Sequence, residues 1–277
     1  MNWWQGLPYK ISPYLFEING FQVRYYSLMY IAAFASVYWL VAYRIRTEAW
    51  PIHKERVYDF FVWAAVGVIL GGRFGYVVFY DFSYYLQHPL EILLPFNLSN
   101  GIKFTGLSGM SFHGGLLGVG VVFFIYCRKH QMNIWDFSDL IIPAVPLGYT
   151  FGRLGNFMNA ELFGRATTLP WGMFFPTDAT HTLRHPSQLY EAFFEGIFLF
   201  ILLWSVKCRP WTKHRICALY LVGYGAVRFL IEFVRQPDPH LNTLWQIFTM
   251  GQILCAAMVI FGLGLLVFQF KRPAGSP

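Results

Sequence analysis

Charged residues are scarce in this chain, and their scarcity indicates its class. Asp, Glu, Lys and Arg make up 13% of the 277 residues, whereas a soluble domain carries about 25%. Apolar residues reach 56% and the mean hydropathy is +0.43, so even the outer surface must be largely apolar. These values exclude a disordered chain, a secreted disulfide scaffold and most soluble enzymes. They predict a protein whose solvent is lipid.

Cysteine is also sparse, and its spacing predicts no chemistry. Cys127, Cys208, Cys217 and Cys255 lie in or beside apolar segments, without a CxxC pair or a nearby pair of histidines. We interpret them as buried, inert thiols and expect no metal site. Residues 1–20 lack a basic stretch followed by an apolar one, so the first membrane helix is expected to direct insertion.

Seven apolar stretches are long enough to cross a membrane as helices, which takes about 20 residues. They predict an all-α polytopic membrane protein with seven transmembrane helices. The fourth stretch is short and contains Pro143 and Pro146. Proline frees backbone groups that neighbouring protein must satisfy, so this helix is expected to lie inside the bundle. The stretches run near residues 25–43, 60–80, 107–127, 137–151, 189–206, 216–234 and 246–270.

The basic residues predict the orientation of the helices. Twelve of the 21 Lys and Arg lie in short segments at alternate helix ends, whereas the long segment 81–106 contains only Lys103. The positive-inside rule then places the N-terminus outside and the C-terminus in the cytoplasm. The net charge of +7 is thus explained by topology, without nucleic acid as a partner. The twelve are Arg44, Arg46, Lys54, Arg56, Arg128, Lys129, Lys207, Arg209, Lys213, Arg215, Lys271 and Arg272.

Two outside segments, near residues 81–106 and 152–188, are long enough to fold. Both mix Pro, Gly and aromatic residues with polar ones, and neither is a low-complexity linker. We expect them to form a small extracytoplasmic cap on a single integral membrane domain, residues 1–277. Tyr84, Tyr85 and Trp171 fit an aromatic belt at the level of the lipid headgroups.

Charged groups within membrane helices are costly and usually mark function. Here the charged and polar residues gather in one layer of the membrane, at the outer ends of five expected helices. Tyr224, Arg228 and Glu232 are four residues apart, so they share one helix face. Structural alternatives are an ion pair for Arg228 with Glu232, a side chain reaching toward headgroups for Arg73, and a satisfied buried histidine for His113. The other members of the layer are Arg24, Tyr26 and Arg153.

Several arginines in a medium of low dielectric constant repel one another unless an anion joins them. Guanidinium groups match phosphate oxygens in bidentate geometry, and a phospholipid headgroup is the anion present at that depth. We therefore expect Arg153 and Arg228 to face one site and bind a phosphodiester. Asp139 lies near the cytoplasmic edge and is expected to be a structural partner.

Residues 152–164 read GRLGNFMNAELFG, which places polar side chains between three glycines at a membrane boundary. Glycine permits close backbone approach, and amide side chains both donate and accept hydrogen bonds. This composition suits the binding of a polar headgroup, and the alternative is a structural re-entrant turn. The form G-R-x-G at 152–155 also occurs at 72–75, which indicates either chance or an internal repeat.

This stretch resembles the signature of the bacterial phosphatidylglycerol–prolipoprotein diacylglyceryl transferases, G-R-x-G-N-F-x-N-x-E-x-x-G, at every fixed position. Other segments resemble the family in the same order, so the resemblance covers nearly the whole chain. The family often has Trp and Gly where this chain has Tyr25 and Ser27, so helix packing around Tyr26 is expected to differ slightly. The other segments are residues 24–30, 72–76, 111–115, 185–191 and 224–232.

The resemblance implies an enzyme of the bacterial inner membrane, with no metal or organic cofactor. It implies transfer of the diacylglyceryl group of phosphatidylglycerol to the lipobox cysteine of a preprolipoprotein, with glycerol phosphate released. Its partners are then phosphatidylglycerol, lipobox signal peptides and membrane lipids. Arg73 and Tyr224 lie in the same layer and are expected to bind substrate. The family's essential and supporting residues map onto Arg153, Arg228, Tyr26, His113, Asn156, Glu161, Gly164 and Glu232.

The expected chemistry suits these residue types. A thiolate must attack the glycerol carbon next to the phosphate ester, and the harder task is to stabilise charge on the departing phosphate. Arg153 and Arg228 are expected to do so with preorganised donors. Glu232 would hold Arg228 in position, and Asn156 and Glu161 would bind the glycerol headgroup.

The residues leave two alternatives open for the proton acceptor. A free thiol has a pKa of about 8.5 and needs only modest help, and His113 is the best-placed general base. Alternatively, His113 orients the lipid while water or another group takes the proton. An alternative from another class is a non-catalytic lipid-binding channel or seven-helix receptor.

Overall fold

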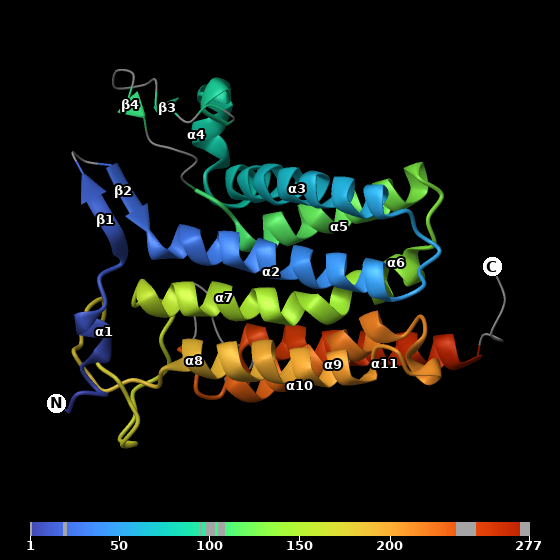
Figure 1. Cartoon of the computed structure of the whole chain (residues 1–277). Coiled ribbons are helices and arrows are strands. Elements are labelled where there is room, and N and C mark those ends of the chain that lie inside the picture. Colours follow the sequence, from blue (N-terminus) through green and yellow to red (C-terminus); the bar gives the residue numbers. More distant parts are fainter. Residues whose placement is uncertain are drawn as a thin grey trace. The chain divides into compact units, whose positions relative to one another are not determined.

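The computed structural model describes residues 2–18, 21–92, 94, 96–97, 103–104, 109–236 and 248–271. The described chain is mostly helical, with two short antiparallel hairpins (Figure 1). It divides into two compact units, one made of Met1–Arg44 with Ser138–Pro277 and the other of Ile45–Phe137. The hairpins pair β1 (Tyr14–Ile18) with β2 (Phe21–Arg24), and β3 (Phe96–Asn97) with β4 (Lys103–Phe104).

Among the described residues, four helical segments are long and apolar enough to cross a membrane, which confirms the prediction of a helical membrane protein. They correspond to the first, second, fifth and seventh predicted stretches. The third and sixth stretches appear as the shorter helices α5 (Phe112–Lys129) and α10 (Ile216–Ile231). The four are α2 (Tyr25–Thr47), α3 (Lys54–Tyr80), the run Ser187–Val206, and α11 (Met250–Lys271), of which residues up to Phe270 qualify.

The fourth predicted stretch is a helix interrupted at its prolines. It consists of α6 (Ile134–Ile141), the 3₁₀ turn η2 (Ile142–Ala144) and α7 (Val145–Met158). Pro143 and Pro146 each lie in the first turn of a segment, where the missing N–H removes no helical hydrogen bond. Both prolines are buried, in keeping with the expected interior position of this helix.

The run Ser187–Val206 contains a π-helix at its centre. The order is α8 (Ser187–Glu191), the π-helix η3 (Ala192–Phe198) and α9 (Leu199–Val206). This run lies beside α7 in Figure 1, and Gly196 makes the approach possible because a Cβ there would overlap Thr150. Thr150 Oγ1 donates to Ala192 O at 3.3 Å. π-Helical turns within α-helices are frequent at functional sites.

Asp139 has the structural role that the sequence predicts. Its carbonyl oxygen and that of Leu140 accept hydrogen bonds from Arg44 NH1 at 2.6 and 2.7 Å, and the Arg44 side chain is fully buried. The Asp139 carboxylate accepts from the backbone N–H of His214 and, at 3.2 Å, of Ile216. These contacts tie the end of α2 and the start of α10 to α6.

In the Ile45–Phe137 unit, α3 and α5 meet through glycines spaced four residues apart, as is common between membrane helices. A Cβ at Gly71 would lie 2.8 Å from Gly118 Cα, and a Cβ at Gly75 would lie 2.6 Å from Gly114 Cα. Larger residues at these positions would therefore push the two helices apart.

Two segments outside the long helices fold in separate units. The described residues of the segment 81–106 belong to the Ile45–Phe137 unit and include α4 (Phe82–Gln87), η1 (Pro89–Ile92) and β3–β4. In the other unit, Met173 and Phe175 form a core with Phe157 and Ala160. The N-terminal residues join that core through α1 (Leu7–Lys10), a contact that the sequence did not predict. Phe174 N donates to Gln5 O, and Trp4 Nε1 donates to Trp171 O, both at 2.9 Å.

The cysteine prediction is wrong for one residue. Cys127 and Cys255 are buried and Cys217 is partly buried, but Cys208 is exposed. Cys208 follows the end of α9 in a basic loop, where Lys207 Nζ lies 3.3 Å from its sulfur. The apolar stretch has already ended at this point, so the thiol has no helix neighbours to cover it.

An ion pair fixes the irregular segment between α7 and α8. Arg184 donates from Nε to Asp178 Oδ2 at 2.8 Å and from NH2 to Oδ1 at 3.1 Å. Burial acts to raise the pKa of the Asp178 carboxyl, but the hydrogen bonds from Arg184 and Thr180 outweigh it, so this pKa lies below its usual value. The pair therefore contributes stability above the unfolded pKa of about 3.9, and that stability is lost as the pH falls toward the lower folded value.

Asp178→Asn is expected to lower the melting temperature of the detergent-solubilised protein at pH 6, because an amide cannot pair with the guanidinium. The expected loss is on the order of 1 kcal/mol, or about 2–4 °C in a domain of comparable size. As the pH falls below about 4, the difference from wild type shrinks progressively, because the carboxyl of the unfolded chain is protonated first and the folded pair only nearer its lower pKa. Glu17→Gln changes an exposed carboxylate and serves as the control. Equal melting temperatures at pH 6 would contradict the assigned pair.

Candidate active site

Three helical segments of one unit, namely α7, α8 with η3, and α10, bring charged and polar side chains together. Their spacing of three or four residues places them on single helix faces. All lie in the unit that contains α2, α7, α8 and α10. The cluster consists of Tyr149, Arg153 and Asn156 from α7, Glu191 and Glu195 from α8 and η3, and Arg228, Glu232 and Arg235 from the end of α10 and the turn after it.

Glu191 is the centre of this cluster. Its side chain is 0% exposed, and its Oε2 lies 2.9 Å from Arg153 Nε and 3.0 Å from Arg228 NH1. The two arginines that the sequence singled out therefore meet on one carboxylate oxygen. The other oxygen, Oε1, faces Arg235 Nε at 3.7 Å, which is longer than a hydrogen bond.

Two further carboxylates bind Arg228. Glu195 Oε1 lies 3.4 Å from Arg228 NH1, and Glu232 Oε2 lies 3.3 Å from Arg228 NH2. The second contact is the pair that the sequence predicted. Glu232 is itself held by Thr249, whose hydroxyl donates to Oε1 at 3.1 Å.

The predicted source of negative charge needs correction. A phospholipid was expected to be the anion that offsets the arginines, but three glutamates already do so in the structure. Glu191 and Glu195 were missed as site residues. Their signal was present, because a pair of acidic residues spaced by four within an apolar membrane stretch is costly and marks function.

The signature segment continues the polar chain beyond Arg153. Arg153 NH1 donates to Asn156 Oδ1 at 3.3 Å, and Asn156 Nδ2 donates to Glu161 Oε1 at 2.8 Å. The turn after α7 has Ala160 and Leu162 at φ values of 53° and 58°, in the left-handed region that non-glycine residues seldom adopt. Gln188 Nε2 holds this turn by donating to Glu161 O at 2.7 Å.

Gly164 is required by close packing. Its N–H donates to His185 O at 2.8 Å. A Cβ at this position would lie 2.5 Å from Val234 O and 2.7 Å from His185 Cβ. The structure therefore places Gly164 between two backbone segments, where a larger residue does not fit.

Aromatic residues border the charged cluster. Tyr26 packs on α7, with its ring 3.1 Å from where a Cβ of Gly155 would be, and its hydroxyl lies 3.1 Å from that of Tyr30. Tyr224 meets Tyr149 edge to face at 5.7 Å. Tyr149, which the sequence argument overlooked, accepts a hydrogen bond from Arg153 Nε at 2.7 Å and donates one to Glu195 Oε2.

Arg73 and His113 belong to the other unit, Ile45–Phe137. Arg73 donates to the carbonyl oxygens of Ile92 at 2.7 Å and Gly109 at 3.4 Å, and its side chain is buried. These contacts give Arg73 a structural role within the protein, which differs from the alternative of a side chain reaching toward lipid headgroups. His113 is exposed in the first turn of α5.

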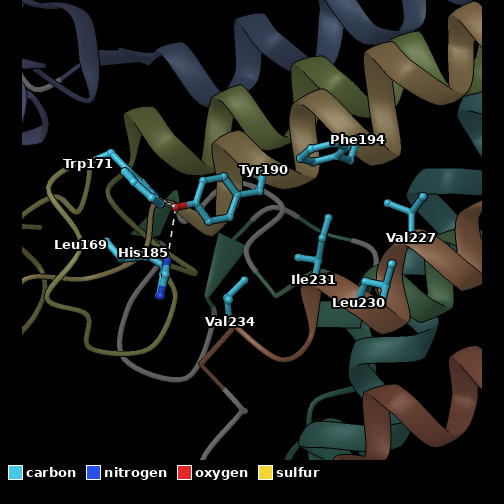
Figure 2. Close-up of a pocket in the computed structure, with 9 residues that line it drawn as sticks. All are labelled: Leu169, Trp171, His185, Tyr190, Phe194, Val227, Leu230, Ile231 and Val234. Carbon is cyan, nitrogen blue, oxygen red and sulfur yellow. Dashed lines mark hydrogen bonds between the residues drawn. The ribbon is translucent and has the colours of Figure 1, made fainter.

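A cleft of about 470 Å³ flanks α10 and η3 in the unit that holds the charged cluster (Figure 2). The hydroxyl of Tyr190 lies at one end, where it accepts from Trp171 Nε1 at 2.9 Å and pairs with His185 Nδ1 at 3.2 Å. Burial lowers the pKa of His185 below its usual value, which favours the neutral ring. The remaining lining is apolar: Leu169, Phe194, Val227, Leu230, Ile231 and Val234.

The fold and the site together define a helical membrane protein with a buried, charge-balanced arginine–glutamate cluster. Among the residues described, no group of three or more His, Cys, Asp or Glu side chains is arranged to hold a metal ion. Comparison with known proteins then gives the family. The sequence profile described as "Prolipoprotein diacylglyceryl transferase" matches residues 13–268.

Similar proteins extend over nearly the whole chain, and those compared carry the name phosphatidylglycerol–prolipoprotein diacylglyceryl transferase. The one from Chlorobaculum tepidum is 51% identical over 272 residues, which cover 98% of this chain and 94% of the relative. The one from Bordetella avium is 43% identical, with 97% and 98% covered. The one from Ectopseudomonas mendocina is 41% identical, with 96% and 97% covered. The chain belongs to the prolipoprotein diacylglyceryl transferase family.

Gly164→Ala is expected to destabilise the protein by about 1–3 kcal/mol, because the new methyl group overlaps two backbone segments. Gly152→Ala is the matched control: a Cβ there meets nothing within 4 Å, and alanine is the better helix former. Thermal unfolding in detergent measures both. A Gly164→Ala protein as stable as Gly152→Ala would show that the close approach is wrong.

Proposed function

We propose that this protein transfers the diacylglyceryl group of phosphatidylglycerol to the lipobox cysteine thiol of a preprolipoprotein. The observation that carries the proposal is the meeting of Arg153 and Arg228 on Glu191, in a chain of this family. The relatives' names join phosphatidylglycerol and prolipoprotein in one transfer reaction.

The step breaks one bond and forms another. A thiolate attacks the glycerol carbon that carries the phosphate ester, and a carbon–sulfur bond forms as the carbon–oxygen bond breaks. The electron pair of the broken bond leaves with the oxygen as glycerol phosphate, and the thiol proton passes to a base. Negative charge therefore develops on the phosphate oxygen as the bond opens.

Arg153 and Arg228 are suited to receive that charge. Within the described part of the chain, Arg153 NH2 and Arg228 Nε donate to no protein acceptor, whereas the other nitrogens of both groups contact Glu191 and its neighbours. Two preorganised donor nitrogens, one on each arginine, thus remain for phosphate oxygens. In a water-poor site, each such donor is commonly worth about 10²–10³ in rate.

The proposal includes the topology that the sequence predicts. We place seven spans in the bacterial inner membrane, with the N-terminus outside, and we treat both compact units as one functional domain. The segments 81–106 and 152–188 would then form the extracytoplasmic cap. Phosphatidylglycerol, lipobox signal peptides and surrounding lipids are the partners, with no nucleic acid and no cofactor.

Substrates that reside in the membrane are expected to enter from the side. The cleft beside α10 is the candidate for such access, because Phe194 and Leu230 in its lining are exposed and would face lipid chains. Its polar end at Tyr190 suits the level of the headgroups.

Arg153→Ala and Arg228→Ala are expected to abolish thioether formation on a lipobox peptide, measured by the mass of the product. Because each leaves a buried glutamate without its partner, Arg153→Lys and Arg228→Lys accompany them. Lysine keeps the charge but loses the planar fork, so we expect a folded protein with at least about 10²-fold lower turnover. Exposed Arg209→Ala is the control. Near-normal turnover in the folded variants refutes the role, and absence of product from wild type favours a non-catalytic lipid-binding protein.

His113→Asn separates the two roles open for His113. If His113 is the general base, the His113→Asn variant should have a turnover about 10²–10⁴-fold lower and a flatter pH dependence of the rate. If His113 only orients lipid, the variant keeps most of its maximal rate and the change appears in KM. A fully active variant with an unchanged pH profile removes His113 from the mechanism.

A further inference from the structure

We propose that Tyr149 is a positioning residue for this transfer, because its hydroxyl lies between the Arg153 guanidinium and the Glu195 carboxylate. Through this hydroxyl, one carboxylate orients both arginines: Arg228 directly and Arg153 through Tyr149. The inference rests on the proposed function and adds a residue that acts through Arg153 rather than on substrate.

The hydroxyl uses its donor and acceptor capacities in opposite directions. It accepts from Arg153 Nε at 2.7 Å and donates its single proton to Glu195 Oε2, with Glu191 Oε2 at 3.5 Å. The Arg153 guanidinium also lies over the Tyr149 ring, 4.7 Å from its centroid. Arginine and tyrosine are four residues apart on α7, so both contacts follow from helix geometry.

Glu195 completes the link to the second arginine. Its side chain is fully buried in the π-helix η3, and its other oxygen lies 3.4 Å from Arg228 NH1. Glu195 therefore has two partners, the Tyr149 hydroxyl and Arg228. Removal of the hydroxyl would leave Oε2 without its hydrogen bond in a place that water does not reach.

The hydrogen bond from Arg153 to Tyr149 determines which edge of the Arg153 guanidinium is available to bind substrate. Tyr149 and Glu191 together hold Nε, and Asn156 Oδ1 accepts from NH1. The NH2 group is left to face substrate. Without the hydroxyl, Glu191 alone holds Nε, and the guanidinium gains freedom to turn its donors away from the phosphate. A small error in orientation at a reacting centre has a large effect on rate.

Tyr149→Phe tests this because it removes the hydroxyl and keeps the ring that packs on Tyr224. We expect kcat for thioether formation to fall about 10- to 100-fold, the loss typical of one hydrogen bond to a charged group. KM for phosphatidylglycerol should stay within about twofold, since binding is shared by other groups. Tyr220→Phe is the matched control: Tyr220 also packs on Tyr224, and its hydroxyl has no hydrogen bond within the described residues. An unchanged kcat for Tyr149→Phe, or an equal fall for Tyr220→Phe, overturns the proposal.

A double-mutant cycle identifies the partner. In a Glu195→Gln background, Tyr149→Phe should have little further effect on kcat, whereas in a Glu232→Gln background it should keep its full effect. Additive effects in both backgrounds overturn the link through Glu195. If Glu195→Gln does not fold, Glu195→Asp takes its place in the cycle.

Melting temperatures of the same variants separate this inference from the proposed function. Tyr149→Phe and Glu195→Gln should be non-additive in stability as well, even if wild type forms no thioether. A missing product then counts against the transferase alone, and additive melting temperatures count against the Tyr149–Glu195 link alone.

Discussion

The structure of the site depends on Glu191, a fully buried carboxylate between two arginines. A charge removed from water costs several kcal/mol, and only close opposite charges and hydrogen bonds repay that cost. Glu191 satisfies this condition with Arg153 and Arg228 at about 3 Å. The same condition makes the arginines dependent on it, because two guanidinium groups so close together would otherwise repel each other. α7, α8 and α10 are thus tied at one point by charge as well as by packing.

The residues around Glu191 balance the charge of the cluster and determine which N–H donors remain available. Glu195 and Glu232 bring the carboxylates to three, against Arg153, Arg228 and Arg235. Because the cluster has as many carboxylates as guanidinium groups, it can be buried in a membrane protein while individual N–H donors still have no hydrogen-bond partner. The π-helix η3 and Gly196 bring Glu195 to the face of α7, where a regular helix with a larger side chain would be held away. Stabilising the charge that develops on a phosphodiester requires unpaired N–H donors in a site from which water is excluded.

Much of this arrangement was predictable from sequence, and the parts that were not have physical reasons. Length and hydropathy predicted α2, α3, α11 and the run Ser187–Val206, because a membrane imposes a long apolar helix. The cost of buried charge predicted that Arg153 and Arg228 face one site, and in the structure both contact Glu191. Glu191 itself was not predicted, because the compensating anion was expected to come from the lipid. The contact of Trp4 with Trp171 joins residues 167 positions apart, and no local pattern encodes it.

In the proposed reaction, Glu191 holds Arg153 and Arg228 so that both act on one phosphate. An experimental structure with phosphatidylglycerol bound measures this most directly, through the distances from the headgroup oxygens to the two guanidinium groups. We expect hydrogen bonds from both arginines to the same phosphate, with the Glu191 carboxylate still between them. A phosphate held by other residues, or arginines drawn apart to separate regions, would contradict it.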